Sequence, residues 1–219
     1  MESPQSQRPV SSLAWPRAKR LLSGGTAGNE LLTAATGAVL IVLLAVIGVT
    51  IIALRPLLSV HLFVGVALIG PTVLKLASTG YRFVRYYTAN PRYRSKGAPP
   101  TLLRLIAPIV VISTVAVMAS GVWLLFAGPQ SREILLPVHK VSFFVWIAFT
   151  SLHVLVHLPA LLRGLRADYV PEVRLGGGTD GRAGRVLSLA SALTAGVVLA
   201  ILLIPEFSPW LHARNFHHY

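Results

Sequence analysis

Long apolar runs separated by short polar segments make up most of the chain. About 20 consecutive apolar residues form a helix long enough to cross a bilayer. Five runs reach that length: residues 31–54, 57–80, 103–127, 136–162 and 186–204. The pattern therefore predicts an all-α fold, a polytopic transmembrane helical bundle with five spans.

The segments that flank the five spans are polar. Residues 1–30 lack the periodic apolar residues that bury a core, so we expect a disordered cytoplasmic segment there. Residues 31–204 form the predicted transmembrane domain, and residues 205–219 form an extracytoplasmic tail.

Turns and kinks follow from proline. Only Arg55 and Pro56 separate the first two apolar runs, which predicts a tight antiparallel hairpin. Pro71 and Pro108 lie inside their runs, and we expect each to kink its span.

The orientation follows from lysine and arginine, which are enriched in cytoplasmic loops. Fifteen of them lie in the N-terminal segment and in the second and fourth loops. Four lie on the other side of the predicted membrane, namely Arg55, Arg132, Lys140 and Arg214. We therefore expect a protein of the plasma (inner) membrane, with its N-terminus in the cytoplasm and its C-terminus outside.

Composition agrees with this class of protein. Hydrophobic residues make up 54% of the chain and charged residues 12%, as in polytopic membrane proteins. The chain has no cysteine, so disulfides, Cys-ligated zinc and iron–sulfur clusters are excluded. The net charge of +13 would suit a nucleic-acid-binding protein, but the basic residues lie in loops where topology requires them. We therefore expect no nucleic-acid partner.

Three histidines lie in the fourth span, where an ionisable residue is costly and is a functional candidate. At 100° per residue, the step from His139 to His153 is about −40°, and the step from His153 to His157 is about +40°. The three side chains therefore share one stripe of the helix. His139 and His153 are about 21 Å apart along its axis.

His61 lies near the start of the second span, which runs in the same direction as the fourth. It is therefore at the same depth as His139, near the outer face. Bis-histidine ligation of haem b needs two imidazoles at similar depth on facing helices. We predict that His61 and His139 are the axial ligands of a haem iron. His153 and His157 are candidate ligands of an inner haem, although no other span offers them a histidine partner.

Lys75 follows His61 by the same 14 residues that separate His153 from His139. Its ammonium could pair with a haem propionate or a quinone oxygen, or it could extend to the inner headgroups. Glycines in the spans, including Gly65 and Gly121, would admit either a flat macrocycle or a closely packed helix.

Two segments outside the spans carry further candidates. Residues 81–94 interleave arginine with tyrosine, which suits docking of an acidic partner or anionic lipid, or simply fixes the topology. The tail carries His212, His217 and His218. They could bind a divalent metal, although a flexible exposed tail is the simpler interpretation.

The histidine His61 at the head of one span, followed by the His139-Lys140 and His153-x-x-x-His157 elements of another, resembles the integral-membrane b-type cytochromes. This group includes the cytochrome b subunits of formate dehydrogenases and nickel hydrogenases. The resemblance covers roughly half of the chain. It implies a haem b, with room for a second haem, in an electron-transfer subunit that links a peripheral oxidoreductase to quinone.

Two other functions stay open at this point. A membrane anchor, assembly factor or small transporter without haem would use the histidines for packing or proton handling. A metal site formed by His153 and His157 would use their i, i+4 spacing, but carboxylate or cysteine partners are missing at that depth.

Overall fold

The computed structural model describes residues 25–95, 97, 101–169 and 181–213. This part of the chain contains five helical segments that are long and apolar enough to cross a membrane. They are α2 (Gly25–Ile52), α3 (Leu54–Ala67) with α4 (Ile69–Tyr87), α6 (Thr101–Ala127), α7 (Arg132–Tyr169) and α9 (Arg182–Leu202). The shorter elements are α5 (Pro91–Arg94), η1 (Pro129–Ser131), η2 (Ile204–Phe207) and α10 (Ser208–Ala213). The predicted all-α bundle with five spans is confirmed.

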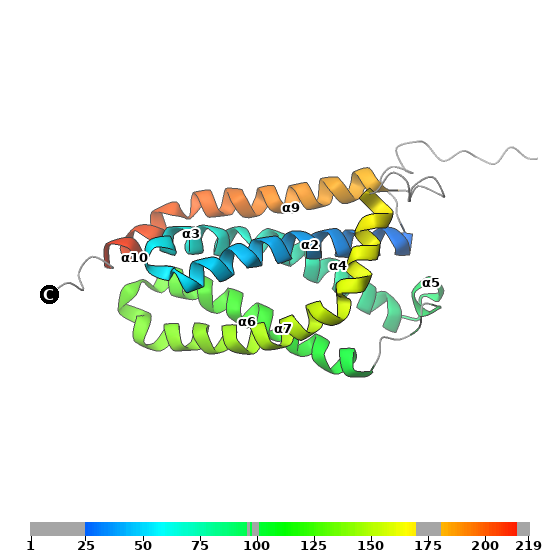
Figure 1. The fold of residues 1–219 in the computed structure, drawn as a ribbon, viewed down its shortest axis with the longest axis horizontal. Coiled ribbons are helices and arrows are strands. Elements are labelled where there is room, and N and C mark those ends of the chain that lie inside the picture. The colour runs from blue at the N-terminus through cyan, green and yellow to red at the C-terminus, as the bar shows by residue number, and fades with distance from the viewer. Residues whose placement is uncertain (1–24, 96, 98–100, 170–180, 214–219) are drawn as a thin grey trace, which may run out of the picture.

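Most of the helices extend past the apolar runs that predict them. Because α2 begins at Gly25, the prediction of disorder over residues 1–30 is wrong for residues 25–30; residues 1–24 lie outside the described part. α7 has 38 residues and is about 57 Å long at 1.5 Å per residue. It bends in its later part, which contains Pro159 (Figure 1). Hydropathy marks only the lipid-covered part of a helix, whereas the backbone hydrogen bonds continue beyond it.

The connection between α2 and α3 is a tight turn, as predicted. Ala53, at φ −121° and ψ 51°, lies alone between the two helices. Leu57 is also non-helical, at φ −105° and ψ 17°. The chain therefore turns over residues 53–57, and Arg55 and Pro56 lie within this turn, as predicted. Proline suits such a turn because its ring fixes φ and it needs no acceptor for an N–H group.

The second span has a break in its hydrogen-bond pattern between α3 and α4, at Leu68, although Leu68 itself keeps helical geometry (φ −61°, ψ −21°). Pro71 has no N–H to donate to the carbonyl oxygen four residues earlier, which belongs to Ala67. The span lacks this one helical hydrogen bond, and the kink predicted for Pro71 stays a prediction. α6, in contrast, continues through Pro108.

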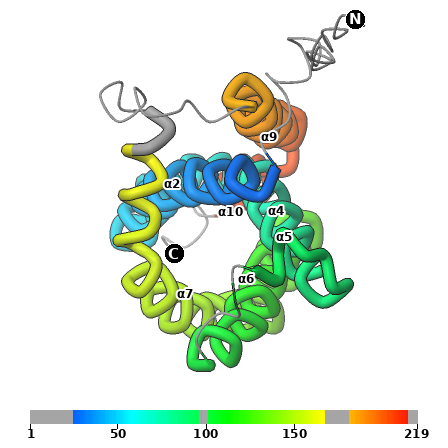
Figure 2. Tube along the Cα trace, turned by 90° about the vertical axis from the view of Figure 1, so that its right-hand side faces the viewer, coloured from blue at the N-terminus to red at the C-terminus, as the bar shows by residue number. Residues whose placement is uncertain are grey.

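Four of the spans surround a common axis, and the fifth lies beside them. α2, α3–α4, α6 and α7 form a ring in the view along the bundle, and α9 packs outside it against α2, α3 and α4 (Figure 2). Glycines permit the close approach of α9. A Cβ atom on Gly196 would meet the carbonyl of Ala67, and one on Gly70 would meet the carbonyl of Ala192. The Ala67 carbonyl, which Pro71 leaves without a helical donor, thus lies against the backbone of α9.

The two ends of the bundle are distinguished here by their short helices, as the α10 end and the α5 end (Figure 1). At the α10 end the chain continues from α9 into η2 and α10. Phe207 is only 4% exposed and belongs to the hydrophobic core. The prediction of a flexible exposed tail is therefore wrong for residues 205–213, because their apolar side chains pack on the bundle. His217 and His218 lie outside the described residues.

The arginine–tyrosine segment is at the α5 end. α5 folds back so that the ring of Tyr93 packs edge-on against Tyr81, with centroids 6.0 Å apart. Burial, together with the nearby Tyr81 hydroxyl, raises the pKa of Tyr93 above its ordinary value, so its phenol stays protonated at neutral pH. Arg82 forms an ion pair with Glu30 at 3.7 Å. Docking and topology both remain predicted roles of this surface.

Large apolar side chains cover the outside of the bundle. Ile52 is 89% exposed and Ile134 is 75% exposed. Soluble monomers rarely expose contiguous apolar surface of this kind, and five apolar helices account for it if lipid covers them. The chain is therefore a membrane protein.

Candidate functional site

His61 lies two turns into α3, and the preceding residue, Val60, lines a pocket together with Ser208 and His212 of α10. Its Nδ1 atom is 2.9 Å from the hydroxyl of Thr50 on the adjacent helix α2. The Thr50 hydroxyl in turn donates to the carbonyl of Ile47 at 2.6 Å. Thr50 is almost fully buried, so this hydrogen-bonded chain is shielded from solvent.

His139 makes the same arrangement with the other helical hairpin. Its Nδ1 atom is 3.0 Å from the hydroxyl of Ser120 on α6, and that hydroxyl donates to the carbonyl of Val117 at 3.1 Å. The imidazole lies over Gly121, where an added Cβ would come within 3.1 Å of the ring carbon Cε1. The glycine therefore makes room for the ring.

The hydrogen bonds assign the tautomer of both imidazoles. A serine or threonine hydroxyl has a single proton, and in Thr50 and Ser120 that proton is donated to a helix carbonyl. The hydroxyl oxygen can only accept from the histidine, so Nδ1 of His61 and of His139 carries the proton. In each neutral ring the Nε2 atom then has its lone pair available as a metal ligand.

The two imidazoles belong to the same region of the bundle. They come from α3 and α7 and are close enough to interact electrostatically. Both are partly buried. Gly65 is one turn below His61, and no atom outside its own helix turn lies within 4 Å of the place where its Cβ would be. His61 and His139 thus lie near each other in the bundle, and their matched depth as haem ligands stays a prediction.

Trp146 lies on the stripe of α7 that carries His139. Trp146 follows His139 by seven residues, which is about −20° around the helix. It is buried, and its indole N–H donates to the hydroxyl of Thr114 on α6 at 3.0 Å. This bond repeats, about two turns lower, the link that Ser120 makes with His139.

A second polar group lies toward the α5 end. The ammonium of Lys75 donates to the carbonyl of Thr33 on α2 at 2.7 Å and lies against Gly37. The hydroxyls of Thr33 and Ser78 are 3.1 Å apart, and the Asn29 amide donates to the Ser78 carbonyl at 3.0 Å. The ammonium is thus held between α4 and α2, which does not fit extension to the headgroups.

His153 and His157 face the same region from α7. Their ring centroids are 4.5 Å apart, and both interact electrostatically with Lys75. Within the described part of the chain, two buried atoms here have no hydrogen-bond partner: Nδ1 of His153 and the hydroxyl oxygen of Thr150. Buried polar atoms are rarely left unsatisfied, which indicates that a ligand or solvent completes this group.

Other predicted ligands have less support. In the described residues no cluster of three or more His, Asp or Glu side chains could hold a metal ion, so the metal site proposed for His153 and His157 gains no further ligand. His212 is exposed, and its Nδ1 atom lies 2.8 Å from the carbonyl of Ser208.

Sequence reasoning missed Thr50, Ser120 and Thr150. Hydroxyl residues are common in membrane helices, and the intervals from Thr50 to His61 and from Ser120 to His139 differ, at 11 and 19 residues. The available signal was a Ser or Thr in the preceding span at the depth of each histidine.

Comparisons of the chain with protein-family models, with curated proteins and with solved structures found no match.

Proposed function

We propose that this protein is a membrane cytochrome that binds haem b and transfers electrons through the bilayer, linking a partner oxidoreductase to quinone. The observation that carries the proposal is the pair His61 and His139. Each belongs to a different hairpin of the bundle, and each is held by a buried hydroxyl that leaves Nε2 ready to bind a metal.

The residues present fit a haem iron. Two neutral imidazoles at one depth are a suitable axial set, and the hydroxyl acceptors at Nδ1 are the outer partners that metal-bound histidines usually have. Gly121 makes room for the His139 ring, and the space next to Gly65, one turn below His61, is open. His61 and His139 would hold the iron, and a bound haem would supply one-electron oxidation and reduction.

The chain itself contributes orientation and shielding. Thr50 and Ser120 fix the rotation of the imidazoles and, by accepting their Nδ1 protons in hydrogen bonds, make the rings more basic ligands. The apolar helices exclude water, which strengthens electrostatic interactions in the site.

The group around Lys75 supports the quinone part of the proposal. The Lys75 ammonium has further N–H donors beyond the one that Thr33 accepts. His153 Nδ1 and the Thr150 hydroxyl are unsatisfied. A quinone carbonyl oxygen accepts hydrogen bonds from such donors.

A second haem is the alternative occupant of the region around Lys75. His153 and His157 lie side by side on one helix, so they cannot bind the iron of one haem from opposite faces. The second ligand of such a haem would have to come from another residue, for example Lys75.

The visible spectrum of the purified protein tests the proposal. Dithionite-reduced wild type, produced with ample haem, should show the sharp bands of low-spin bis-histidine haem b. His61→Ala and His139→Ala should each remove or convert the same spectral component, because each deletes one axial ligand. His153→Ala and His157→Ala should leave that component unchanged.

His212→Ala is the matched control, because this histidine is also at the α10 end but is exposed and bound to Ser208. It should keep the wild-type spectrum. A wild type that binds no haem would exclude the cytochrome function and favour the haem-free anchor, assembly factor or transporter.

A further inference from the structure

We propose that the segment formed by η2 and α10, here called the strap, positions the two histidine ligands, with Phe207 and Trp210 as its positioning residues. The inference rests on the proposed haem site. It concerns how the α2–α4 hairpin, which holds His61, is kept at the right distance from the α6–α7 hairpin, which holds His139.

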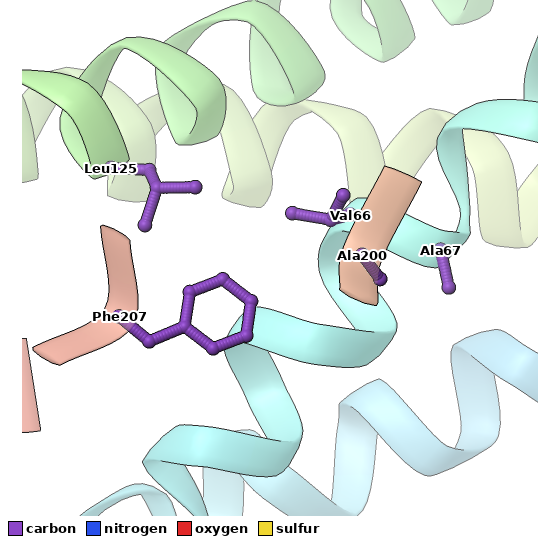
Figure 3. Packing of buried hydrophobic residues seen from close by; sticks show 5 residues of the cluster. All are labelled: Val66, Ala67, Leu125, Ala200 and Phe207. Carbon is purple, nitrogen blue, oxygen red and sulfur yellow. The ribbon is translucent and has the colours of Figure 1, made fainter. Parts of the chain in front are cut away.

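Phe207 joins the two hairpins by packing between them. It is 4% exposed and shares one cluster with Val66 of α3, Leu125 of α6 and Ala200 of α9 (Figure 3). Direct contacts between α3 and α6 are few. The phenyl ring therefore fills space that neither hairpin fills by itself.

Trp210 adds a directional bond. Its indole N–H donates to the carbonyl of Leu125 at 3.2 Å. α6 ends at Ala127, so this carbonyl is among the last four of the helix and has no intrahelical donor. The bond therefore gives the Leu125 carbonyl oxygen a donor that the helix does not supply, and it links the strap to α6.

The other end of the strap is anchored through α9. Gly196 lies so close to Ala67 that no side chain fits between them, which fixes α9 against the break between α3 and α4. The strap follows α9 directly. It therefore connects a point fixed on the first hairpin to the end of α6 on the second.

The strap acts close to both ligands. Val66 follows His61 by five residues, and Leu125 follows Ser120 by five residues, which is about 7.5 Å along each helix. Leu62, the neighbour of His61, also packs against the cluster. A shift of the strap would therefore change the separation of the two imidazoles rather than the hydroxyl bond of either one.

Spin-label distances test this independently of haem. The chain has no cysteine, so Leu54→Cys on α3 and Phe126→Cys on α6, both exposed, give one defined pair of labels. In the haem-free protein, Phe207→Ala and Trp210→Phe should shift or broaden the distance distribution, and Phe207→Leu should restore most of it. The control variants Trp123→Phe and Phe144→Ala alter exposed residues and should keep the wild-type distribution.

Haem binding gives the second readout. The two strap variants should retain haem about tenfold less tightly, in line with the loss of other supports around metal ligands, and should shift its midpoint potential. Wild-type distances and wild-type haem affinity in both variants would overturn the proposal. If the wild type binds no haem but the strap variants still shift the distances, the cytochrome function is contradicted. The strap would nevertheless be shown to set the separation of the two hairpins.

Discussion

Thr50 and Ser120 occupy equivalent places beside the two histidines, and their hydroxyls accept the Nδ1 proton of each ring. Thr50→Val and Ser120→Ala keep the packing but remove the acceptor. The imidazole should become a weaker donor to iron, so we expect a more positive midpoint potential and about tenfold weaker haem binding. Redox titration of the purified variants measures the potential, and transfer of haem to an excess of an apo-haemoprotein measures the affinity.

Two neighbouring hydroxyls provide controls for that experiment. Thr36 and Ser113 are also buried and bond to carbonyls of their own helices, Leu32 and Val110, without contacting a histidine. Thr36→Val and Ser113→Ala should leave the potential unchanged. An equal shift in all four variants would mean that hydroxyl loss acts through helix packing and not through the ligands.

Lys75 tests the second polar group. Lys75→Met keeps the length of the side chain but removes the ammonium, so reduction of a quinone analogue should become several-fold slower or need more substrate. The spectral component assigned to His61 and His139 should persist. Lys140→Met, on an exposed lysine of α7, is the control. Unchanged quinone kinetics in Lys75→Met would limit the lysine to bridging α4 and α2 through Thr33.

At the scale of single residues, the sequence singled out His61 and His139 but not their hydrogen-bond partners, and the role of the two histidines as haem ligands stays a prediction. The depth of His61 and His139 followed from helix geometry and the direction of the spans, because rise per residue is nearly constant. Thr50 and Ser120 could not be chosen among the many hydroxyls, since rotation of each helix about its axis depends on packing with its neighbours. The hydrogen bond from Trp210 to Leu125 spans 85 residues, and no local pattern predicts such a pair.

At the level of whole helices, the contact of α9 with the α3–α4 break depends on two glycines. Gly196→Ala would place a methyl group against the Ala67 carbonyl, and relief of such overpacking typically costs about 1–3 kcal/mol. We expect a lower unfolding temperature in detergent. Gly48→Ala is the control, because no atom outside its own turn lies within 4 Å of the new methyl group. Destabilisation by Gly48→Ala of the same size would show that the contact is not the cause.

The five spans could be predicted because hydropathy reports lipid-covered length directly. The ends of the helices could not be predicted, since α2, α4 and α7 continue as helices through polar residues.

The strap was missed for a different reason. Residues 205–213 are too short for a span, and Pro205 and Pro209 are typical of a loop. The alternation of proline with Phe207 and Trp210 was the available signal of a packed segment.

For the whole molecule, the asymmetry of basic residues sets the expected topology. A periplasmic reporter fused after Tyr219 should be active, and a cytoplasmic reporter inserted at residue 97 should be active. The α10 end would then face outward, and His61 and His139 would lie near the outer surface. Activity of a cytoplasmic reporter at the C-terminus would contradict both the orientation and the odd number of crossings.

The division of the two proposed ligands between two hairpins has a consequence for biogenesis. Each histidine and its hydroxyl partner belong to one hairpin, so each half can take its final form before the halves meet. His61 precedes His139 by 78 residues, a delay of about 4–16 s at about 5–20 residues per second of synthesis. During that interval the first hairpin would already be in the bilayer with one of the two proposed ligands. A nascent chain stalled before α6 should therefore hold haem weakly or not at all, and capture should begin only once α7 has been inserted.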